Sequence, residues 1–588
     1  MTHMVVTRVV TEESTSQHWI TYRHDSDASS YASGAYVSPY KFEFTWRKLW
    51  AYAGPGWIMS VAYLDPGNLE ADLQMGAYSG LTLVWVLWWS TCMGLFLQEM
   101  ASRLGIVTGK DLAQVAKENY SDFQCAALYV NMEAAIIGAD IQEVVGAAIA
   151  LKLLFGLPLW AGVLITGVDT FTFLGIHKSG MTCLEALTLG LICVMLVTFF
   201  MVWADAPTTP PGEFFEGWAI PRLPKHAVSA AVGTLGSVIM PHNLYLHSGI
   251  VLPFETDRID PNDITEACRY SFIDSSIALL VSFAINIAVV GAFAANFNDD
   301  SCAQQNKACV GCTPDDDSQC MTGNSDFCGD ESFQAVCMDL GLDNAGEALS
   351  QSAPGGDRVY VAWAIGLLAS GQAATIAATF AGQIVMEGFC PGIRLSVWKR
   401  QLFARFVVLG PALLVAILTA HHLEEFTSIN QWLNILQAVQ LPFAIIPLLH
   451  LTCKQSVMGE FRTRGYHMLV ACSIATFVLF VNYYLFVTFL SQSNSPVPHN
   501  AYYFFAGCGV YAVVYSGFLL SLVKAEIIYG MEILANKFTS FARKVSSPAL
   551  RRSGYSDNLL SDGDCATTSS TTQEDEYAPR TQDVNTIG

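Results

Sequence analysis

Apolar runs long enough to cross a membrane recur along the whole chain. They lie at about 50–77, 80–103, 124–154, 159–176, 181–203, 228–252, 271–297, 358–387, 402–420, 430–452, 466–490 and 501–527. About 20 apolar residues in a helix cross roughly 30 Å of hydrocarbon, and a helix satisfies its own backbone hydrogen bonds in lipid. The ten-residue alternation of a membrane barrel is absent from the sequence. The sequence therefore predicts an all-α polytopic membrane protein with about 12 transmembrane helices.

The composition agrees with a lipid bilayer as the surroundings of the chain. Of 588 residues, 52% are hydrophobic and 14% are charged, and the mean hydropathy is +0.37. A soluble multidomain protein rarely has this composition. The net charge of −21 comes mainly from one loop and the two tails, and it argues against nucleic acid as a partner.

The chain divides into a membrane domain and two tails. Residues 1–45 and 528–588 are polar and rich in Ser and Thr, so we expect disordered tails. Residues 46–527 form the transmembrane domain. Basic residues such as Arg103, Lys178 and Arg394 fall in alternate short loops, which places both termini in the cytosol. We expect a multi-pass protein of the plasma membrane or of an endosomal or vacuolar membrane.

The longest loop on the other side, residues 298–357, is acidic and rich in cysteine. It holds six of the sixteen cysteines: Cys302, Cys309, Cys312, Cys320, Cys328 and Cys337. An even number of cysteines in an oxidising compartment favours disulfides, here three with fifteen possible pairings. The alternative is a metal cage, because Cys309 and Cys312 have the C-x-x-C spacing. We prefer disulfides because no histidine accompanies these cysteines.

Two apolar segments are interrupted by polar residues and proline. The first interruption is Asp65-Pro66-Gly67-Asn68, and the second is Met240-Pro241-His242-Asn243. A carboxylate at mid-bilayer costs several kcal/mol. Proline removes a backbone donor and glycine relaxes φ, so carbonyl and side-chain oxygens become free to bind a cation. Two interrupted segments in corresponding halves of a chain indicate the substrate site of a transporter.

Four motifs make the chain similar to a known family. They are residues 62–69 (AYLDPGNL), 98–113 (QEMASRLGIVTGKDLA), 239–248 (IMPHNLYLHS) and 366–389 (GLLASGQAATIAATFAGQIVMEGF). These motifs resemble the Nramp family of proton-coupled divalent-metal transporters, over roughly residues 45–490. The resemblance implies a LeuT-like fold, in which helices 1 to 5 and 6 to 10 form a 5+5 inverted repeat. It also implies that helices 1 and 6 are broken at the midplane.

The candidate metal ligands combine hard and soft donors. Asp65 supplies an anionic oxygen and Asn68 a neutral one, whereas Met240 supplies a thioether of little use to Mg²⁺ or Ca²⁺. This mixture suits Mn²⁺ and Fe²⁺ and should also admit Co²⁺ or Cd²⁺. The alternative role for Met240 is to fill a gap in the core, as most methionines do.

Two further ligands follow from the resemblance. The family usually has alanine three residues before the methionine, where this chain has Ser237, and that residue contributes a backbone carbonyl. A hydroxyl beside the ion would shift selectivity. The tenth helix of the family offers an amide, and Asn434 aligns best with it. The alternative role for Asn434 is an interhelical hydrogen bond.

Three acids on the third span are candidates for proton transfer. Glu133, Asp140 and Glu143 lie at i, i+7 and i+10, on one helical face. They are either a proton relay or structural partners of Arg400 or Arg405. The resemblance favours the relay, with Asp65 linking metal and proton because metal binding requires its deprotonated form.

Two histidines follow the second break. His242 and His247 are five residues apart, so they point about 140° from one another on a regular helix and cannot both face one ion. The resemblance implies that they line the proton or metal pathway and tune gating, together with the breaks at Pro66, Gly67 and Pro241. The alternative is a hydrogen-bonded scaffold role.

These observations predict a secondary active transporter. It would carry Mn²⁺ or Fe²⁺ toward the cytosol with H⁺ by alternating access, with the metal as substrate and no cofactor. A Na⁺-coupled carrier of an organic solute on the same fold is the alternative, but it leaves Asp65 and Met240 unexplained. A membrane metalloenzyme would carry a motif such as H-E-x-x-H, which the sequence lacks, so we do not expect an enzyme.

Overall fold

A computed structural model describes residues 42–177, 181–254, 256–311, 335–353, 355–391, 399, 409–414, 416–417, 430, 433–434, 436–491 and 501–522. Most of the predicted tail 1–45 and all of the predicted tail 528–588 lie outside these residues. The first half contains α1 (Trp46–Tyr52), α2 (Pro55–Val61), α3 (Pro66–Ser79), α4 (Val84–Thr108), α5 (Leu112–Asn119), α6 (Asp122–Phe155), α7 (Leu159–His177), α8 (Met181–Ala204) and α9 (Pro211–Ala219).

The second half is also helical, apart from one short pair of strands. It contains the 3-10 helix η2 (Lys225–Ala227), α10 (Val228–Val238), α11 (Pro241–Ile250), α12 (Pro261–Phe297), α13 (Asp300–Ala303), β1 (Ala308–Gly311), β2 (Ala335–Met338), α14 (Leu342–Ser352), α15 (Asp357–Phe389), α18 (Pro442–Cys453), α19 (Gln455–Met458), η4 (Gly459–Phe461), α20 (Gly465–Ser491) and α21 (Ala501–Leu522). The long helices coincide with predicted apolar runs, whereas the short helices α5, α9, α13, α14 and α19 lie between those runs.

Five of the described helices combine membrane length with an apolar composition. They are Asp122–Phe155, Cys183–Ala204, Pro261–Phe297, Asp357–Phe389 and Leu436–Cys453. The first and sixth predicted spans are each divided into two shorter helices, which is why neither reaches this length alone. The strands β1 and β2 are a departure from the all-α prediction, and they lie in the loop outside the membrane domain.

Both predicted interruptions are breaks between helices. Helix α2 ends at Val61 and α3 begins at Pro66, while α10 ends at Val238 and α11 begins at Pro241. In each case proline occupies the first position of the second helix, where the backbone N–H has no helical partner in any case. The preceding helix ends because proline cannot donate to the carbonyl four residues earlier.

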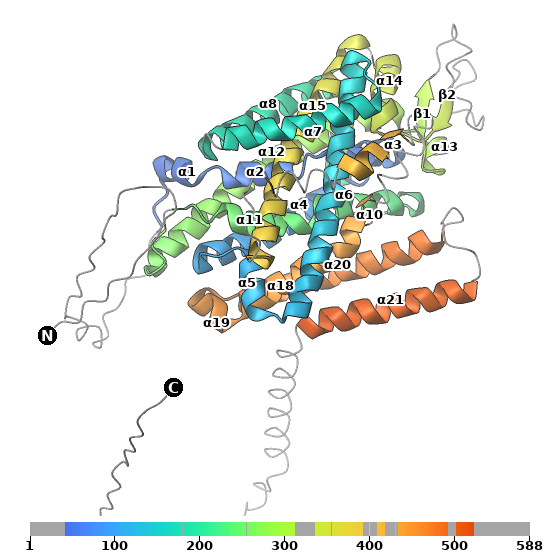
Figure 1. Cartoon of the computed structure of the whole chain (residues 1–588). Helices are drawn as coiled ribbons and strands as arrows, with labels where there is room; N and C mark the ends of the chain where they lie inside the picture. The colour runs from blue at the N-terminus through green and yellow to red at the C-terminus, as the bar shows by residue number, and fades with distance from the viewer. Residues whose placement is uncertain are drawn as a thin grey trace, which may run out of the picture. The chain divides into compact units, whose positions relative to one another are not determined.

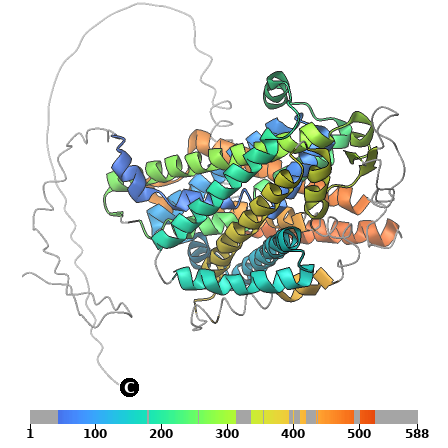
Figure 2. The same ribbon diagram turned by 90° about the horizontal axis from the view of Figure 1, so that it is seen from above.

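Long helices pack closely around the first break. A Cβ on Gly146 of α6 would lie 2.5 Å from Pro66 Cβ, and a Cβ on Gly76 of α3 would lie 2.4 Å from the carbonyl oxygen of Val290 in α12. Glycine therefore lets α6 and α12 approach the broken helix without a clash. Figure 1 shows α6, α12 and α15 beside α2 and α3, and Figure 2 shows α8 next to α15.

Side chains from two neighbouring helices hold the unwound backbone after α2. On α12, Ser282 Oγ donates to the carbonyl of Ser60 at 2.9 Å, and Asn286 Nδ2 donates to the carbonyl of Tyr63 at 2.9 Å. On α15, Ser370 Oγ donates to the carbonyl of Leu64. These donors replace the helical hydrogen bonds that the break removes, so the break is a fixed element of the fold.

The cysteine-rich loop is joined by disulfide bonds. Cys302 and Cys337 form one, with a Cα–Cα distance of 5.3 Å, and Cys309 is also disulfide-bonded. The antiparallel strands β1 and β2 place Cys309 opposite Cys337. The other three cysteines of the predicted set, Cys312, Cys320 and Cys328, lie outside the described residues.

Asn286→Ala should destabilise the protein more than a matched change on the same helix. The carbonyl of Tyr63 lies outside a helix and would lose its donor, at a cost of about 1 to 2 kcal/mol. The control is Asn296→Ala, since Asn296 Nδ2 donates to the carbonyl of Ala292 on its own helix, which keeps its backbone bond. The midpoint of thermal unfolding in detergent measures both, and equal shifts would contradict the holding role of Asn286.

Candidate functional site

The first break presents oxygen atoms from Asp65 and Asn68. Asp65 caps α3 in an extended conformation (φ −68°, ψ 164°), and its Oδ1 accepts the Asn68 backbone N–H at 2.7 Å. Asn68 Nδ2 donates to Asp65 Oδ2 at 3.2 Å and to the carbonyl of Ala62 at 3.3 Å. Both side chains are at most 3% exposed. Asn68 Oδ1 has no hydrogen-bond partner among the described residues, so this buried oxygen is available to a cation.

The second break has the same construction. Met240 caps α11 in an extended conformation (φ −90°, ψ 138°), and Pro241 follows it. Because Pro241 has no N–H, the carbonyl of Ser237, four residues earlier, receives no helical hydrogen bond from it. Pro66 likewise leaves the carbonyl of Ala62 without a helical hydrogen bond, and Asn68 Nδ2 donates to that carbonyl instead. Each break therefore places a carbonyl without a helical partner at the end of one helix and a side chain at the start of the next.

The hydroxyl of Ser237 is directed into its own helix. Its Oγ donates to the carbonyl of Thr234 at 3.1 Å, and the residue is 1% exposed. The departure from the family's alanine thus leaves the hydroxyl hydrogen engaged within α10. The backbone carbonyl of the same residue is the group that Pro241 releases.

Contacts between helices bring the two breaks together. Helix α10 packs against α3, and α11 packs against α2. A Cβ on Gly67 would lie 3.2 Å from both Asp65 Oδ1 and the amide group of Gln142. A Cβ on Gly236, one residue before Ser237, would lie 3.9 Å from the carbonyl oxygen of Asn434. The tenth span therefore lies beside the second break and reaches the first through Gln142.

Side-chain amides connect the third span with the tenth span. Gln142 Nε2 donates to Asn434 Oδ1 at 2.8 Å and to Asn430 Oδ1, and Gln437 Nε2 donates to Gln142 Oε1 at 2.6 Å. Asn430 Nδ2 in turn donates to Glu70 on α3. Gln437 Oε1 is buried without a hydrogen-bond partner among the described residues. The oxygen of Asn434 is thus engaged, whereas the oxygen of Gln437 is open.

Sequence reasoning identified Asn434 but missed the rest of this amide network. The missed residues are Gln142, Asn430, Gln437 and Glu70. Their signal was present, because each is a polar residue inside an apolar span. Nothing in their spacing, however, indicates that they meet.

The three predicted acids of the relay lie on α6, which is one continuous helix of 34 residues. Asp140 and Glu143 are 5% and 4% exposed, and Glu133 is half-buried. Glu133 is hydrogen-bonded to the hydroxyl of Tyr129, one turn earlier, and interacts electrostatically with Asp140. Arg400 and Arg405 lie outside the described residues.

His242 and His247 both lie on α11, after the break. They are 2% and 0% exposed. Because α11 is a regular helix from Pro241 onward, the break does not bring the two rings to one side. His242 Nδ1 has no hydrogen-bond partner in the described part of the chain, which leaves it open to water or a proton.

Comparisons with known proteins agree with this architecture. Residues 56–488 match the family model described as natural resistance-associated macrophage protein-like, Nramp. The metal transporter Nramp3.2 of Populus trichocarpa is 39% identical over 523 residues, covering 88% of this chain and 92% of the relative. The metal transporter nramp1 homolog of Dictyostelium discoideum is 40% identical over 449 residues, covering 76% of each.

A solved structure extends the similarity to three dimensions. The manganese transporter of Eremococcus coleocola, crystallised with an aromatic bis-isothiourea compound, is 28% identical and superposes with a TM-score of 0.65, covering 85% of this chain and 98% of that one. The chain belongs to the Nramp family of integral membrane metal transporters, and its fold is the LeuT-like arrangement of two inverted five-helix repeats.

Proposed function

We propose that the chain carries Mn²⁺ or Fe²⁺, and also Cd²⁺ and Co²⁺, toward the cytosol together with H⁺ by alternating access. The observation that carries this proposal is the pair of proline-started breaks, which place a carboxylate, an amide and a thioether at the starts of α3 and α11, two helices that pack against α10 and α2 of the opposite break. The similarity to a named manganese transporter supports the choice of ion.

The proposed ligands combine Asp65 and Asn68 with Met240 and the carbonyl of Ser237. The thioether sulfur favours softer ions, whereas Ca²⁺ prefers six to eight oxygen ligands and gains nothing from sulfur. An ion of this kind can lose most of its water here because carbonyl and side-chain oxygens replace it.

The hydrogen bonding of the amide network favours Gln437 as the metal ligand from the tenth span. Its Oε1 has no partner within the described chain, whereas Asn434 Oδ1 accepts from Gln142. We therefore propose that Asn434 positions Gln142, and that Gln437 approaches the ion.

Proton coupling is proposed to begin at Asp65. A divalent cation binds only the ionised carboxylate, so metal and proton compete for the same group. The proton would then pass along the face of α6 that carries Glu133, Asp140 and Glu143, with His242 beside the site. Arg400 and Arg405 are proposed to lie on the same route.

The burial of the site speaks against an organic substrate. Pockets for small organic molecules occupy about 300 to 1,000 Å³. Asp65, Asn68 and Met240 are at most 3% exposed, and this burial favours a small ion as the substrate.

The decisive experiment uses proteoliposomes that enclose a metal-sensitive and a pH-sensitive dye. We expect saturable Mn²⁺ entry with internal acidification, insensitive to excess Ca²⁺ or Mg²⁺. Asp65→Ala should lower both signals by more than roughly tenfold, because it removes the charged ligand. Mn²⁺ entry without acidification would refute the coupling, and metal-independent Na⁺ flux would favour the solute carrier.

Met240→Ala should change ion selectivity more than it changes rate. Loss of the sulfur removes the advantage of a soft ion, so Ca²⁺ should compete with Mn²⁺ more strongly while Mn²⁺ uptake falls less. The measurement is the inhibition of Mn²⁺ uptake by Ca²⁺. Met75→Ala is the control, since Met75 is a buried methionine on α3 that accepts from Thr234. If the affinities for Mn²⁺ and for Ca²⁺ fall by the same factor, the thioether is not the element that selects between the two ions.

Gln437→Ala and Asn434→Ala separate the two amides of the tenth span. If Gln437 binds the ion, its replacement should raise the KM for Mn²⁺ by about tenfold or more. Asn434→Ala should raise it less, because Gln142 keeps its bonds to Asn430 and Gln437. The opposite order would assign the ligand role to Asn434.

A further inference from the structure

The outer end of α3 is tied to the cysteine-rich loop by side chains. The backbone N–H of Leu340 donates to Tyr78 Oη at 2.9 Å, and Gln74 Nε2 donates to the carbonyl of Leu340 at 3.2 Å. Tyr78 Oη lies 3.3 Å from the same carbonyl oxygen. Leu340 is fully buried and Tyr78 is 7% exposed. A single loop residue thus makes hydrogen bonds with two turns of the helix.

A second contact reaches the same end of α3 from α12. Asn298 Nδ2 donates to the carbonyl of Ala77 at 3.1 Å. A Cβ on Gly80, the residue that ends α3 with φ 58°, would lie 3.0 Å from Asn298 Oδ1. Glycine therefore permits the close approach of the Asn298 amide to the end of the helix.

The Cys302–Cys337 disulfide joins the two segments that make these contacts. Asn298 precedes Cys302 by four residues, and Leu340 follows Cys337 by three. Both half-cystines are buried. The disulfide, Asn298 and Leu340 thus enclose the outer end of α3, and we call this set the outer clamp.

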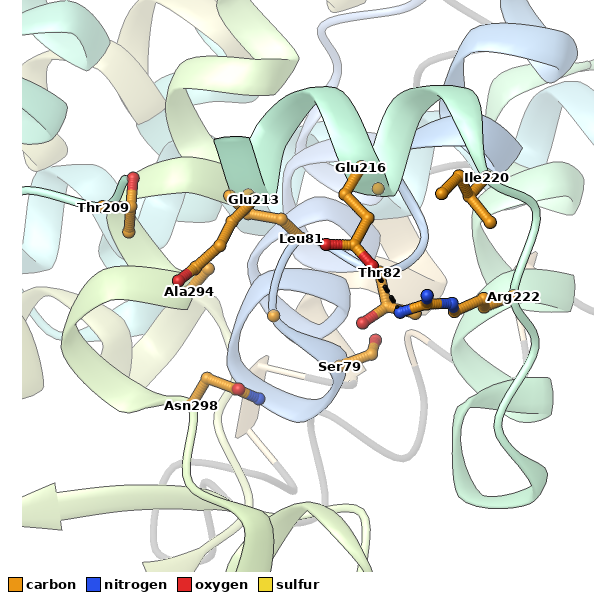
Figure 3. Close-up of a pocket in the computed structure, with 12 residues that line it drawn as sticks. Ser79, Leu81, Thr82, Thr209, Glu213, Glu216, Ile220, Arg222, Ala294 and Asn298 are labelled. Atoms are coloured by element: carbon orange, nitrogen blue, oxygen red, sulfur yellow. Dashed lines mark ion pairs between the residues drawn. The ribbon is translucent and has the colours of Figure 1, made fainter. Parts of the chain in front are cut away.

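Next to the outer clamp the turn after α3 borders a pocket that is open to the surface. It has a volume of about 230 Å³ and is lined by this turn, by α9 and by the end of α12, and Figure 3 shows Ser79, Asn298 and Glu216 among the lining residues. Helix α9 packs closely on the same turn, since a Cβ on Gly217 would lie 2.0 Å from the carbonyl oxygen of Leu81. The outer clamp therefore holds the end of α3 from the side of the cysteine-rich loop.

We propose that the outer clamp positions α3 for metal binding, so that Tyr78 and Gln74 are positioning residues and the Cys302–Cys337 disulfide controls the affinity for the metal. This inference rests on the transport function proposed above. Helix α3 is regular over 14 residues and carries Asp65 at its start, about 20 Å from the clamp at 1.5 Å per residue. A tilt about one end displaces the other, and metal ligands tolerate shifts of only about 0.2 Å.

The first test compares two tyrosines. Tyr78→Phe removes the hydroxyl that contacts Leu340, and we expect the KM for Mn²⁺ uptake to rise about three- to tenfold with an unchanged maximal rate. Tyr515→Phe is the control, because its hydroxyl donates to the carbonyl of Val439 at 2.8 Å and so connects α21 with the tenth span and not with α3. The KM of this variant should stay within about twofold of the wild-type value. An equal change in both variants, or none in Tyr78→Phe, overturns the proposal.

The second test uses the disulfide itself. Replacing Cys302 and Cys337 together by serine, or treating proteoliposomes with an impermeant reductant, should raise the KM as Tyr78→Phe does. In the Tyr78→Phe variant, removing the disulfide should raise the KM only slightly further, because loss of the hydroxyl and loss of the disulfide release the same contact. Fully additive effects overturn the proposal, since they would mean that the disulfide and Tyr78 act separately.

Hydrogen exchange distinguishes failure of the clamp from failure of the transport function. In metal-free protein, the backbone amides of residues 66–79 should exchange faster in the serine variant than in the wild type. Wild-type protein that takes up no Mn²⁺ would refute the transport proposal alone. Unchanged exchange over α3 would refute the outer clamp, whatever the uptake.

Discussion

Two missing backbone N–H groups determine the architecture around the site. Pro66 and Pro241 cannot donate to the carbonyls of Ala62 and Ser237, and lipid offers no water to replace them. The chain must supply other partners for these carbonyls or leave them to a ligand. The carbonyl of Ala62 illustrates the first solution, because Asn68 Nδ2 donates to it. Helices α12 and α15 do the same for the neighbouring carbonyls of Ser60, Tyr63 and Leu64. The carbonyl of Ser237 is the one that we propose is left to a ligand.

The same constraint explains why the amide network surrounds the breaks. A buried carboxylate or amide costs several kcal/mol unless it is satisfied. Gln142 uses both ends of its side chain, accepting from Gln437 while it donates to Asn430 and Asn434. Asn430 extends these bonds to Glu70 on α3. These polar groups therefore connect the third and tenth spans to the first.

Local signals in the sequence were sufficient for the spans and the breaks but not for the network. Hydrophobic length predicts each span, and Pro66 and Pro241 mark the breaks by their own chemistry. Gln142 meets Asn430 across 288 residues, and Asn286 meets Tyr63 across 223. No spacing rule operates over such separations. The strands β1 and β2 escaped prediction for a related reason, since they are only four residues long each and pair across a loop in which Cys309 lies opposite Cys337.

In the proposed mechanism, metal binding and proton binding are connected by the charge balance at the breaks. Helices α3 and α11 both begin at the site, so each directs the positive end of its dipole toward a bound cation. At α3 the carboxylate of Asp65 offsets the positive end of the helix dipole. Helix α11 instead begins after Met240, which is neutral and makes no capping hydrogen bond. The carbonyl ends of α2 and α10 contribute only partial charge. One carboxylate therefore carries the formal negative charge among the proposed ligands, and a proton on it leaves a site whose remaining donors are neutral. Coupling between the two ions then needs no long-range signal, because it follows from competition for a single oxygen pair.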